Sequence, residues 1–534
     1  MFKSTAKKRE ELFQEQIKVK RENFNFELIQ QFWSKHPNQP DEHFVADRTA
    51  RDLDLDEVFI FLDRTTSRVG QQYLYRLLRT IPKSNARANE QEKLVGKFRD
   101  DLNLKKSCIQ ELSKLKKKEA YRICTLFQDE QLKKPKWFWV IQMLAFLSLS
   151  CLIGAIFYPV LWIAFIFIFI ANFTLHYWNK KNVFRYGNSI PQLLRLIQVS
   201  KTIRKLTKTQ SPDLDESIQK LDQIANRLSV FRLEDKLQSD VSQIAEYIVE
   251  MTRVAFLIEP ILLFHSLKKL ESRKSNIETL FSFTGKMDVA ICMDTLRSTV
   301  DNYCMPVFNE REKAISALNI YHPLIIAPVE NSIQTKEKSV LLTGSNMSGK
   351  TTFIRTIGIN CLVGQTLNMC FASEFHMNKM NIQTAIHMAD DLMSDKSYYY
   401  EEVLSIKNIL DESQSEQENL FLLDELFKGT NTLERIATGK AVLSYLHNIK
   451  NTVFIATHDL ELVDYLKNQY DLYHFSENVE NDEINFDYKL KEGKLRNTNA
   501  IKILAANGYP KAVISEAYNM VSTLKQKGSE TNLS

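Results

Sequence analysis

One stretch of this chain limits its possible folds more than any other. From Trp137 to Trp178 the sequence contains no Lys, Arg, Asp or Glu, and Leu, Ile, Phe and Val predominate. This is roughly twice the ~20 residues that a helix needs to cross the hydrocarbon core of a bilayer. Pro159 stands near the middle, where it would end one helix and begin another. The stretch therefore predicts two apolar helices, at about 137–157 and 160–178, joined by a turn.

Basic and aromatic residues mark both ends of this stretch. They are Lys133, Lys134, Lys136, Trp137 and Trp139 on one side, and Tyr177, Trp178, Lys180 and Lys181 on the other. Positive charge stays on the cytoplasmic side of a membrane, and Trp and Tyr favour its interfaces. The pattern predicts a transmembrane hairpin in the cell membrane, with both soluble parts of the chain in the cytoplasm. The alternative is a pair of buried helices in a soluble core, although such helices seldom lack charge over this length.

The whole chain, at 534 residues, is too long for one core. We predict five parts, in chain order: an N-terminal helical segment at 1–44, a first helical core part at 45–131, the hairpin region at 132–181, a second helical core or lever part at 182–318, and an α/β domain at 319–534. In the second helical part, a long helix is expected across Gln243–Ser272, with a kink at Pro260. The charged stretch after Met1 has no apolar segment, so we do not expect a signal peptide there.

Composition argues against two kinds of site. The seven cysteines are spread from Cys108 to Cys370 without paired spacing, which disfavours both a disulfide framework and a zinc site. The formal net charge of +5 is small, so it neither requires nor excludes nucleic acid as a partner.

Strands and helices alternate in the last part of the chain. Short apolar runs at Ser339–Thr343, Leu420–Leu423 and Thr452–Ala456 predict strands, and the segments Thr351–Leu362 and Leu433–Asn448 predict helices. This alternation is typical of a mostly parallel sheet with helices on both faces.

The segment that follows the first of these strands fits the phosphate-binding loop pattern G-x-x-x-x-G-K-[ST]. Its residues, with the threonine after them, are Gly344, Ser345, Asn346, Met347, Ser348, Gly349, Lys350, Thr351 and Thr352. The glycines let backbone N–H groups turn toward phosphate oxygens, and the next helix adds its positive N-terminus. We expect Lys350 to contact the β- and γ-phosphates of ATP and the Thr351 hydroxyl to bind Mg²⁺.

The ends of the other two strands carry the remaining catalytic candidates. Asp424 and Glu425 follow one strand directly; Asp424 is predicted to hold Mg²⁺, and Glu425 to orient or polarise the attacking water. His458 follows the other strand, so we expect it to reach the γ-phosphate from the same edge of the sheet. The alternatives are a solvated turn for the acidic pair and a structural role for His458.

Together these motifs resemble the ATPase domain of the MutS family, which is related to ABC-type ATPases. Thr343–Thr352 is similar to the family's T-G-P-N-M-x-G-K-S-T, with Ser345 in place of proline. Leu422–Thr432 is similar to its L-L-D-E-x-x-x-G-T-S-T. Asp390–Ser397, with Glu402 downstream, is similar to its D-D-L-x-S-G-x-S segment. The resemblance implies an ABC-like P-loop fold for the α/β domain.

The resemblance continues on both sides of these motifs. Ala500–Ala517 is similar to the C-terminal helical segment that supports dimerisation in the family. Asp47–Pro82, which contains Leu62-Asp63-Arg64-Thr65 and Gly70, resembles the start of the family's helical core. About 45 residues precede it, too few for a mismatch-recognition domain. We therefore interpret the Phe-x-Glu-like triplet within Phe24–Glu27 as a chance match.

The resemblance implies a homodimer with composite ATP sites. The counterpart of Ser397 acts across the dimer, on ATP held by the partner's phosphate loop. Asp395 stands where the family has glycine, and Lys396 where it has arginine. A carboxylate near a triphosphate is electrostatically unfavourable, so Asp395 would weaken or regulate this contact. The alternative is that 390–402 is only the acidic start of a helix.

The sequence leaves three outputs of ATP hydrolysis open. The resemblance implies DNA binding by the dimer, in DNA repair or a related process, although no extended basic and aromatic pattern supports base recognition. The alternative is a membrane-associated ATPase that remodels a protein partner without DNA. A transporter subunit is the least favoured reading, because two helices per chain show no polar pathway.

Overall fold

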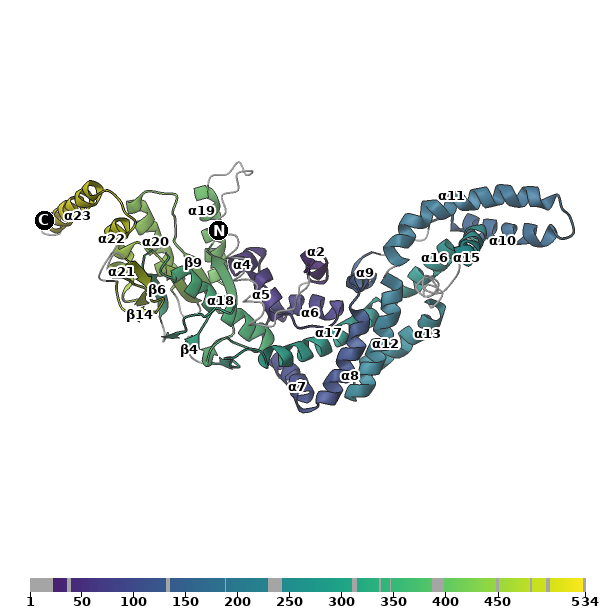
Figure 1. Cartoon of the computed structure of the whole chain (residues 1–534), viewed down its shortest axis with the longest axis horizontal. Coiled ribbons are helices and arrows are strands. Elements are labelled where there is room, and N and C mark those ends of the chain that lie inside the picture. Colours follow the sequence, from purple (N-terminus) through teal and green to yellow (C-terminus); the bar gives the residue numbers. More distant parts are fainter. Residues whose placement is uncertain are drawn as a thin grey trace.

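The chain forms an elongated molecule, seen here in a computed structural model (Figure 1). The described residues are 23–35, 40–130, 135–187, 189–228, 243–309, 315–335, 338–345, 347–386, 398–415, 417–447, 451–480, 483–495 and 500–531. The α/β domain and the C-terminus lie at one end, a helical body lies in the middle, and two long helices project at the other end (Figure 1).

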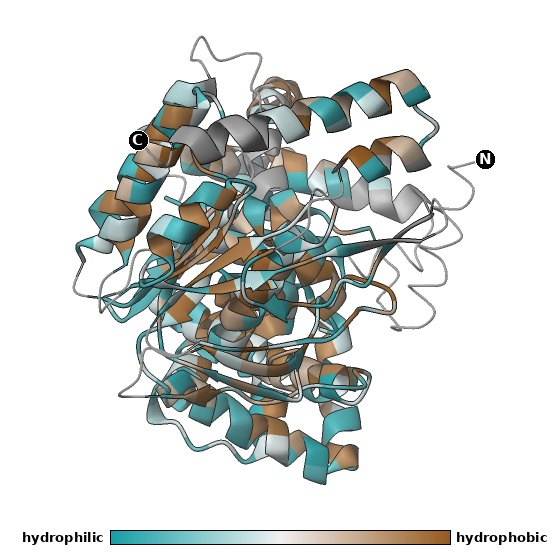
Figure 2. Ribbon diagram, turned by 90° about the vertical axis from the view of Figure 1, so that its left-hand side faces the viewer, coloured by the Kyte–Doolittle hydropathy of each residue, from teal (hydrophilic) through white to brown (hydrophobic). Residues whose placement is uncertain are grey.

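A six-stranded sheet of order β14-β11-β6-β10-β9-β8 forms the centre of the α/β domain. Its strands are β6 Ser339–Thr343, β8 Asn381–Ala385, β9 Asn419–Asp424, β10 Asn451–Ala456, β11 Tyr470–His474 and β14 Lys491–Glu492. Neighbouring strands are parallel except β14, which pairs antiparallel with β11. The inner strands are buried and apolar, as a parallel sheet covered on both faces requires; they are the brown arrows at the centre of Figure 2.

Four helices pack on this sheet: α18 Lys350–Leu367, α19 Tyr398–Ser413, α20 Thr432–Leu446 and α21 Leu460–Leu466. Two more follow at the C-terminus, α22 Ala500–Ala506 and α23 Lys511–Thr531, and α23 projects away from the sheet (Figure 1). The strands and helices expected from the alternating pattern coincide with β6, α18, β9, α20 and β10, with small shifts at their ends.

A second sheet of order β3-β7-β4-β5 lies beside the first one, and the sequence pattern did not predict it. Its strands are β3 Val307–Phe308, β4 Ser316–Ile320, β5 Asn331–Gln334 and β7 Glu374–Met377, and a separate hairpin pairs β12 Glu477–Glu480 with β13 Glu483–Phe486. These strands are too short for periodicity to separate them from loops.

The helical body packs around one long helix, α17 Lys274–Arg297, which runs from the α/β domain into the body (Figure 1). The other elements are α2 Phe26–Ile29, α3 Gln31–Ser34, β1 Glu42–Phe44, α4 Asp47–Asp52, α5 Leu55–Leu62, α6 Arg68–Leu78, β2 Thr80–Pro82, α7 Ala86–Asp100, α8 Leu102–Leu112, two 3-10 turns at Ser113–Leu115 and Lys118–Ile123, α9 Thr125–Gln128, α12 Ser189–Thr207 and α13 Pro212–Leu228. One hydrophobic core joins this body to the α/β domain, for instance where the rings of Phe61 and Phe371 meet at 5.6 Å.

The motif around Gly70 has a structural explanation. The carboxylate of Asp288 on α17 accepts the backbone N–H groups of Thr66 at 2.8 Å and Ser67 at 2.7 Å, and so fixes the chain just before α6, where the Ser67 hydroxyl accepts the N–H of Gly70 and caps the helix. A Cβ at Gly70 would lie 2.2 Å from Asp288 Oδ2, which explains the glycine. Complete burial raises the pKa of Asp288 to about 6.

The N-terminal Phe-x-Glu-like triplet also belongs to this core. The ring of Phe26 lies 5.9 Å from that of Phe59, and Phe24 lies 6.1 Å from the same ring. Both phenylalanines are partly buried and pack against the core of the helical body, so they do not form a projecting wedge of the kind that enters DNA.

Two helices form the projecting hairpin: α10 Phe138–Gly154 and α11 Leu161–Gly187. Their bases meet where the rings of Trp137 and Trp178 stand 5.1 Å apart. Among the described residues, one helix is long and apolar enough to cross a membrane, by length and composition: α11, over Leu161–Trp178, where 11% of the residues are buried; α10 is shorter. Both expected helices are therefore present, and their crossing of a membrane stays a prediction.

The expected long helix across Gln243–Ser272 is wrong, because the structure has two helices there. They are α15 Gln243–Ala255 and α16 Ile258–Glu271, and the chain turns sharply at Leu257, whose φ is 47°. Pro260 lies in the first turn of α16, where its missing N–H costs no helical hydrogen bond. The break therefore precedes the proline.

Candidate active site at the phosphate-binding loop

The loop between β6 and α18 has the shape that its glycines predict. Gly344 has a φ of 150° and Gly349 a φ of 106°, values that side chains with a Cβ rarely adopt. A Cβ on Gly344 would also lie 2.7 Å from the carbonyl oxygen of Phe475 and 2.8 Å from Ser348 Oγ. The loop therefore turns tightly against its neighbours. Asn346 lies outside the described residues, and Met347 and Thr352 are exposed.

Lys350 is buried within this loop. Its Nζ donates to the carbonyl oxygens of Gly344 and Ser345, each at 2.8 Å, and burial lowers its pKa to about 8. Ser348 Oγ is also buried and has no hydrogen-bond partner within the described part of the chain. A phosphate group fits both features, because it would offer negative charge to the ammonium group and acceptor oxygens to the hydroxyl.

The two predicted Mg²⁺ ligands touch one another. Thr351 Oγ1, on the first turn of α18, donates to Asp424 Oδ2 at 2.6 Å, and Asp424 stands at the carboxyl end of β9. No cluster of three or more His, Cys, Asp or Glu able to hold a metal occurs in the described residues. A hydroxyl and a single carboxylate suit Mg²⁺, which takes its other ligands from water and substrate phosphates.

Glu425 and His458 meet beside Lys350. His458 Nε2 lies 2.8 Å from Glu425 Oε1 and 3.4 Å from Lys350 Nζ, and Lys428 Nζ lies 3.1 Å from Glu425 Oε2. The hydrogen bond from His458, helped by Lys428, lowers the pKa of Glu425 to about 2. Glu425 also has a φ of 54°, a strained value for a residue with a side chain. The carboxylate is thus ionised and held at the mouth of the phosphate loop.

The loop that follows Glu425 rests on α19. The carboxylate of Glu402 accepts the backbone N–H of Lys428 at 3.3 Å, and burial raises the pKa of Glu402. A Cβ on Gly429 would lie 3.0 Å from Tyr399 Cβ, so a glycine allows this close packing. Ser397, which precedes α19, lies outside the described residues together with Asp395 and Lys396. The trans role of Ser397 therefore stays a prediction.

Sequence reasoning missed the opposite wall of the site. A hollow of about 1000 Å³ extends from the phosphate loop to the segment Ile320–Val329 and to Tyr488. His322 lies in this wall, and burial, with a smaller effect of Arg355, lowers its pKa to about 4. The half-exposed apolar run that starts at Leu324 faces the same space. Such a run in a loop was the one sequence signal for this wall.

A second missed residue is Glu477 on β12. Ser345 Oγ donates to Glu477 Oε2 at 2.7 Å. The family pattern has proline at the position of Ser345, so this hydrogen bond depends on a departure from that pattern. It connects the phosphate loop to the β12–β13 hairpin.

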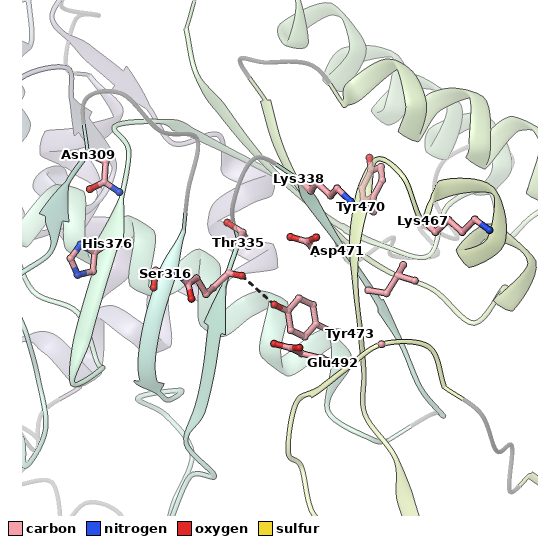
Figure 3. Close-up of a pocket in the computed structure, with 13 residues that line it drawn as sticks. Asn309, Ser316, Thr335, Lys338, His376, Lys467, Tyr470, Asp471, Tyr473 and Glu492 are labelled. Carbon is pink, nitrogen blue, oxygen red and sulfur yellow. Dashed lines mark hydrogen bonds between the residues drawn. The ribbon is translucent and has the colours of Figure 1, made fainter.

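A larger hollow, of about 1210 Å³, lies between the two sheets, beside β11 and β14 (Figure 3). Its lining includes the carboxylates of Asp471 and Glu492 near Tyr473, and Lys338 and His376 from other elements. Tyr473 Oη donates to the carbonyl oxygen of Gln334 at 3.2 Å. None of the predicted ATP-site residues lines it. The smaller hollow is therefore the candidate active site, because it brings the predicted side chains together.

Comparison with known proteins agrees with this site. Residues 340–525 match the family model described as MutS domain V. The chain is 30% identical over 273 residues to the DNA mismatch repair protein MutS of Petrotoga mobilis, covering 49% of this chain and 33% of that protein. The chain is also 30% identical to the DNA mismatch repair protein MutS of Lactobacillus acidophilus, over 43% of this chain and 28% of that protein. It is 30% identical to the DNA mismatch repair protein MutS of Aquifex pyrophilus, over 39% of this chain and 26% of that protein. The chain spans about a third of the length of these relatives or less.

Proposed function

We propose that this chain, a member of the MutS family through residues 340–525, is a Mg²⁺-dependent ATPase that works as a homodimer. The observation that carries the proposal is the meeting of Thr351 with Asp424 at 2.6 Å, beside Lys350 and the Glu425–His458 pair. Side chains from β9, β10 and α18 converge there on one edge of the sheet. That arrangement is suited to hold a nucleoside triphosphate and to orient water for attack on its γ-phosphate.

Each residue has a distinct task in this proposal. The loop N–H groups and Lys350 hold the phosphates, and the Thr351 hydroxyl and Asp424 hold Mg²⁺, which supplies charge neutralisation on those phosphates. The ionised Glu425 orients the attacking water, and His458, whose Nε2 lies 3.4 Å from Lys350 Nζ, contacts the γ-phosphate in this proposal. The apolar side chains near Leu324, with Tyr488, offer the other wall to the nucleoside.

The first test is hydrolysis by the purified full chain in detergent. Turnover is expected with Mg²⁺ and should stop with EDTA. Lys350→Ala should lose ATP binding as well, since it removes a charge-assisted contact to phosphate. Lys440→Ala, at an exposed lysine on α20, is the matched control and should behave as wild type. Mg²⁺-independent turnover would contradict the assignment of Thr351 and Asp424.

The homodimer has its own test, which rests on the trans role of Ser397. Ser397→Arg and Lys350→Ala homodimers should both be inactive. In a mixed dimer one composite site carries both substitutions and the other carries none, so roughly half of the wild-type turnover should return if the sites act independently. With subunit exchange demonstrated separately, no recovery at any mixing ratio would exclude a trans-acting Ser397.

DNA is the partner that we propose for the dimer, in DNA repair or a related process, because the relatives are DNA mismatch repair proteins. Addition of duplex or branched DNA should raise the rate of ATP hydrolysis. A second candidate is a membrane-associated ATPase that remodels a protein partner; it is favoured by the exposed apolar hairpin α10–α11 at the end of the molecule away from the ATP site (Figure 1). A turnover rate that no DNA changes would favour this second candidate.

We also propose that α10 and α11 anchor the chain in the cell membrane, with the ATPase domain in the cytoplasm. Large apolar side chains along both helices are exposed, among them Phe146, Ile156, Phe157 and Phe167. Leaving such a surface in water is costly, so a bilayer is a better environment for it. Co-flotation of the full chain with lipid vesicles tests the anchor, and a chain that stays dispersed in buffer without detergent would argue against it.

A further inference from the structure

The base of the hairpin is packed against protein. Phe138 and Ile141 of α10 lie in a small buried cluster with Leu257 and Phe264, at and after the turn between α15 and α16. On α11, Asn172 is buried, and its Nδ2 donates to the carbonyl oxygen of Ala255 at 2.7 Å, where α15 ends. The α15–α16 corner is therefore fixed against α11 at Asn172, well inside the apolar stretch.

A group of ionisable residues, with two glutamates, an arginine and a histidine, lies just behind this corner. His176 Nε2 is 3.6 Å from Glu250 Oε1 and 3.7 Å from Glu259 Oε2, and Arg253 Nη1 is 3.4 Å from Glu259 Oε1. Charged side chains are costly in hydrocarbon. The hydrocarbon of a membrane should therefore begin on the side of this group that faces the turn of the hairpin.

The hairpin beyond these groups is short. From Asn172 to the turn at Val160, α11 rises about 18 Å, and from His176 about 24 Å, at 1.5 Å per residue. The hydrocarbon core is about 30 Å thick, so half of it is about 15 Å. In Figure 1, α15 and α16 lie along the half of the hairpin nearer to the body, and the turn extends beyond them. The length beyond Asn172, where α11 is held by the α15–α16 corner, is close to one leaflet, and even the length beyond His176 is about 6 Å short of a full crossing.

The turn itself is built for an apolar environment. Ile156 and Phe157 are 77% and 75% exposed, and the hydroxyl of Tyr158 is the one polar side-chain group between Ala155 and Val160. The backbone N–H groups of 155–158 and 161–163 all donate to carbonyl oxygens of the hairpin. The first N–H groups of a helix usually need water or a cap, but here the turn supplies partners for those of Leu161, Trp162 and Ile163, and the N–H of Val160 is the exception among the described residues of the turn. Backbone groups must be paired in this way within hydrocarbon, whereas a turn in water has no such need.

We infer that the α10–α11 hairpin enters one leaflet of a lipid bilayer and ends within the hydrocarbon, so that it anchors the chain without crossing the membrane. This inference rests on the proposed membrane anchor and replaces the transmembrane hairpin expected from the sequence. Both arrangements leave the two soluble parts on the same side, so the location of those parts does not separate them. The position of the turn separates them, because it lies within the hydrocarbon in one arrangement and in water across the membrane in the other.

The test uses the full chain reconstituted into sealed vesicles of phosphatidylcholine and phosphatidylglycerol. Phe157→Cys is exposed to a membrane-impermeant maleimide, both trapped inside the vesicles and added outside. The hairpin that ends in hydrocarbon should stay unlabelled until detergent dissolves the bilayer, whereas Leu102→Cys, at a 62% exposed residue of the body, should react at once. Labelling of Phe157→Cys on intact vesicles would overturn the inference and leave the anchor in place.

A second measurement uses charge at the turn. Phe157→Asp should weaken co-flotation on the order of a hundredfold relative to Phe157→Leu, because the carboxylate would enter hydrocarbon. ATP hydrolysis in detergent should be equal in the two variants, which shows that both fold. Equal flotation of the two variants would mean that the turn reaches water and would overturn the inference. A wild-type chain that does not float at all would instead reject the proposed anchor, and the inference with it.

Discussion

The two ends of the molecule are opposite in chemistry. At the ATPase end, charged groups are drawn out of water: Lys350 and Glu425 have pKa values of about 8 and about 2 because of burial and of paired neighbours. At the hairpin end, aromatic and aliphatic side chains such as Phe146 and Phe157 are left outside any protein core. Burial of the Lys350 ammonium group and exposure of the apolar hairpin side chains both cost free energy in the isolated chain. The comparison teaches why the two proposals differ in chemistry: a phosphate group would offset the buried charge at one end, and lipid would cover the apolar surface at the other.

The largest effect is expected at the ATPase end. Glu425→Gln should lower ATP turnover by about a thousandfold while ATP binding is retained, because the carboxylate that orients water is lost and the phosphate contacts remain. Single-turnover hydrolysis and binding of a labelled ATP analogue would measure the two effects. Glu418→Gln, just before the other end of β9, is the matched control. Turnover equal to wild type would remove Glu425 from the mechanism.

The next effect concerns the hairpin end. Phe146→Lys should reduce vesicle co-flotation on the order of a hundredfold, since a charge on a 72% exposed apolar face would enter lipid. Turnover in detergent should not change. The matched control is Tyr465→Lys, at a 64% exposed aromatic residue of α21 at the opposite end of the molecule, and it should leave flotation unchanged. If both substitutions weaken flotation equally, lipid binding is not confined to the hairpin end of the molecule.

A smaller effect tests the link between the phosphate loop and the β12–β13 hairpin. Ser345→Ala removes the hydrogen bond to Glu477 and should weaken ATP affinity by about fivefold, or about 1 kcal/mol, the net contribution of a typical intramolecular hydrogen bond. Glu477→Gln should act similarly, and the double variant should be no weaker than either single one. Additive losses of affinity would show that the two side chains act separately.

The smallest effect lies in the helical body between the two ends. Burial raises the pKa of Asp288 to about 6, so the folded protein binds a proton at this carboxylate more tightly than the unfolded chain does. The stabilisation that this proton gives is fully present below the unfolded pKa of Asp and is lost as the pH rises through about 6. From pH 7 to pH 5 the free energy of unfolding should rise by about 1 kcal/mol more in wild type than in Asp288→Asn. Urea midpoints at the two pH values would measure this, and identical pH profiles would contradict it.

The local sequence determined those features that depend on neighbours along the chain. The apolar runs of β6, β9 and β10 are recognisable because a buried parallel strand needs them, and the residues directly after them reach one edge of the sheet. Gly344 and Gly349 were predictable for a similar reason, because their φ values exclude most other residues. The phosphate loop and its acidic partners therefore followed from sequence.

The tertiary structure alone decided the contacts between distant segments. Glu477 reaches Ser345 across 132 positions, and Asp288 reaches Ser67 across 221, because packing of whole elements brings them together. No local pattern encodes such partners. The wall at Ile320–Val329 and Tyr488 belongs to the same class, since it is formed by two loops that are distant in the chain.

The hairpin shows both contributions in one element. Its sequence alone predicted two apolar helices, because a run without charge that is broken by Pro159 has few other folds. How much of that run is free to meet lipid depends on the α15–α16 corner, which packs at Asn172. Sequence determines the length of an apolar segment, but the neighbouring elements that cover part of it determine how deeply it can enter a membrane.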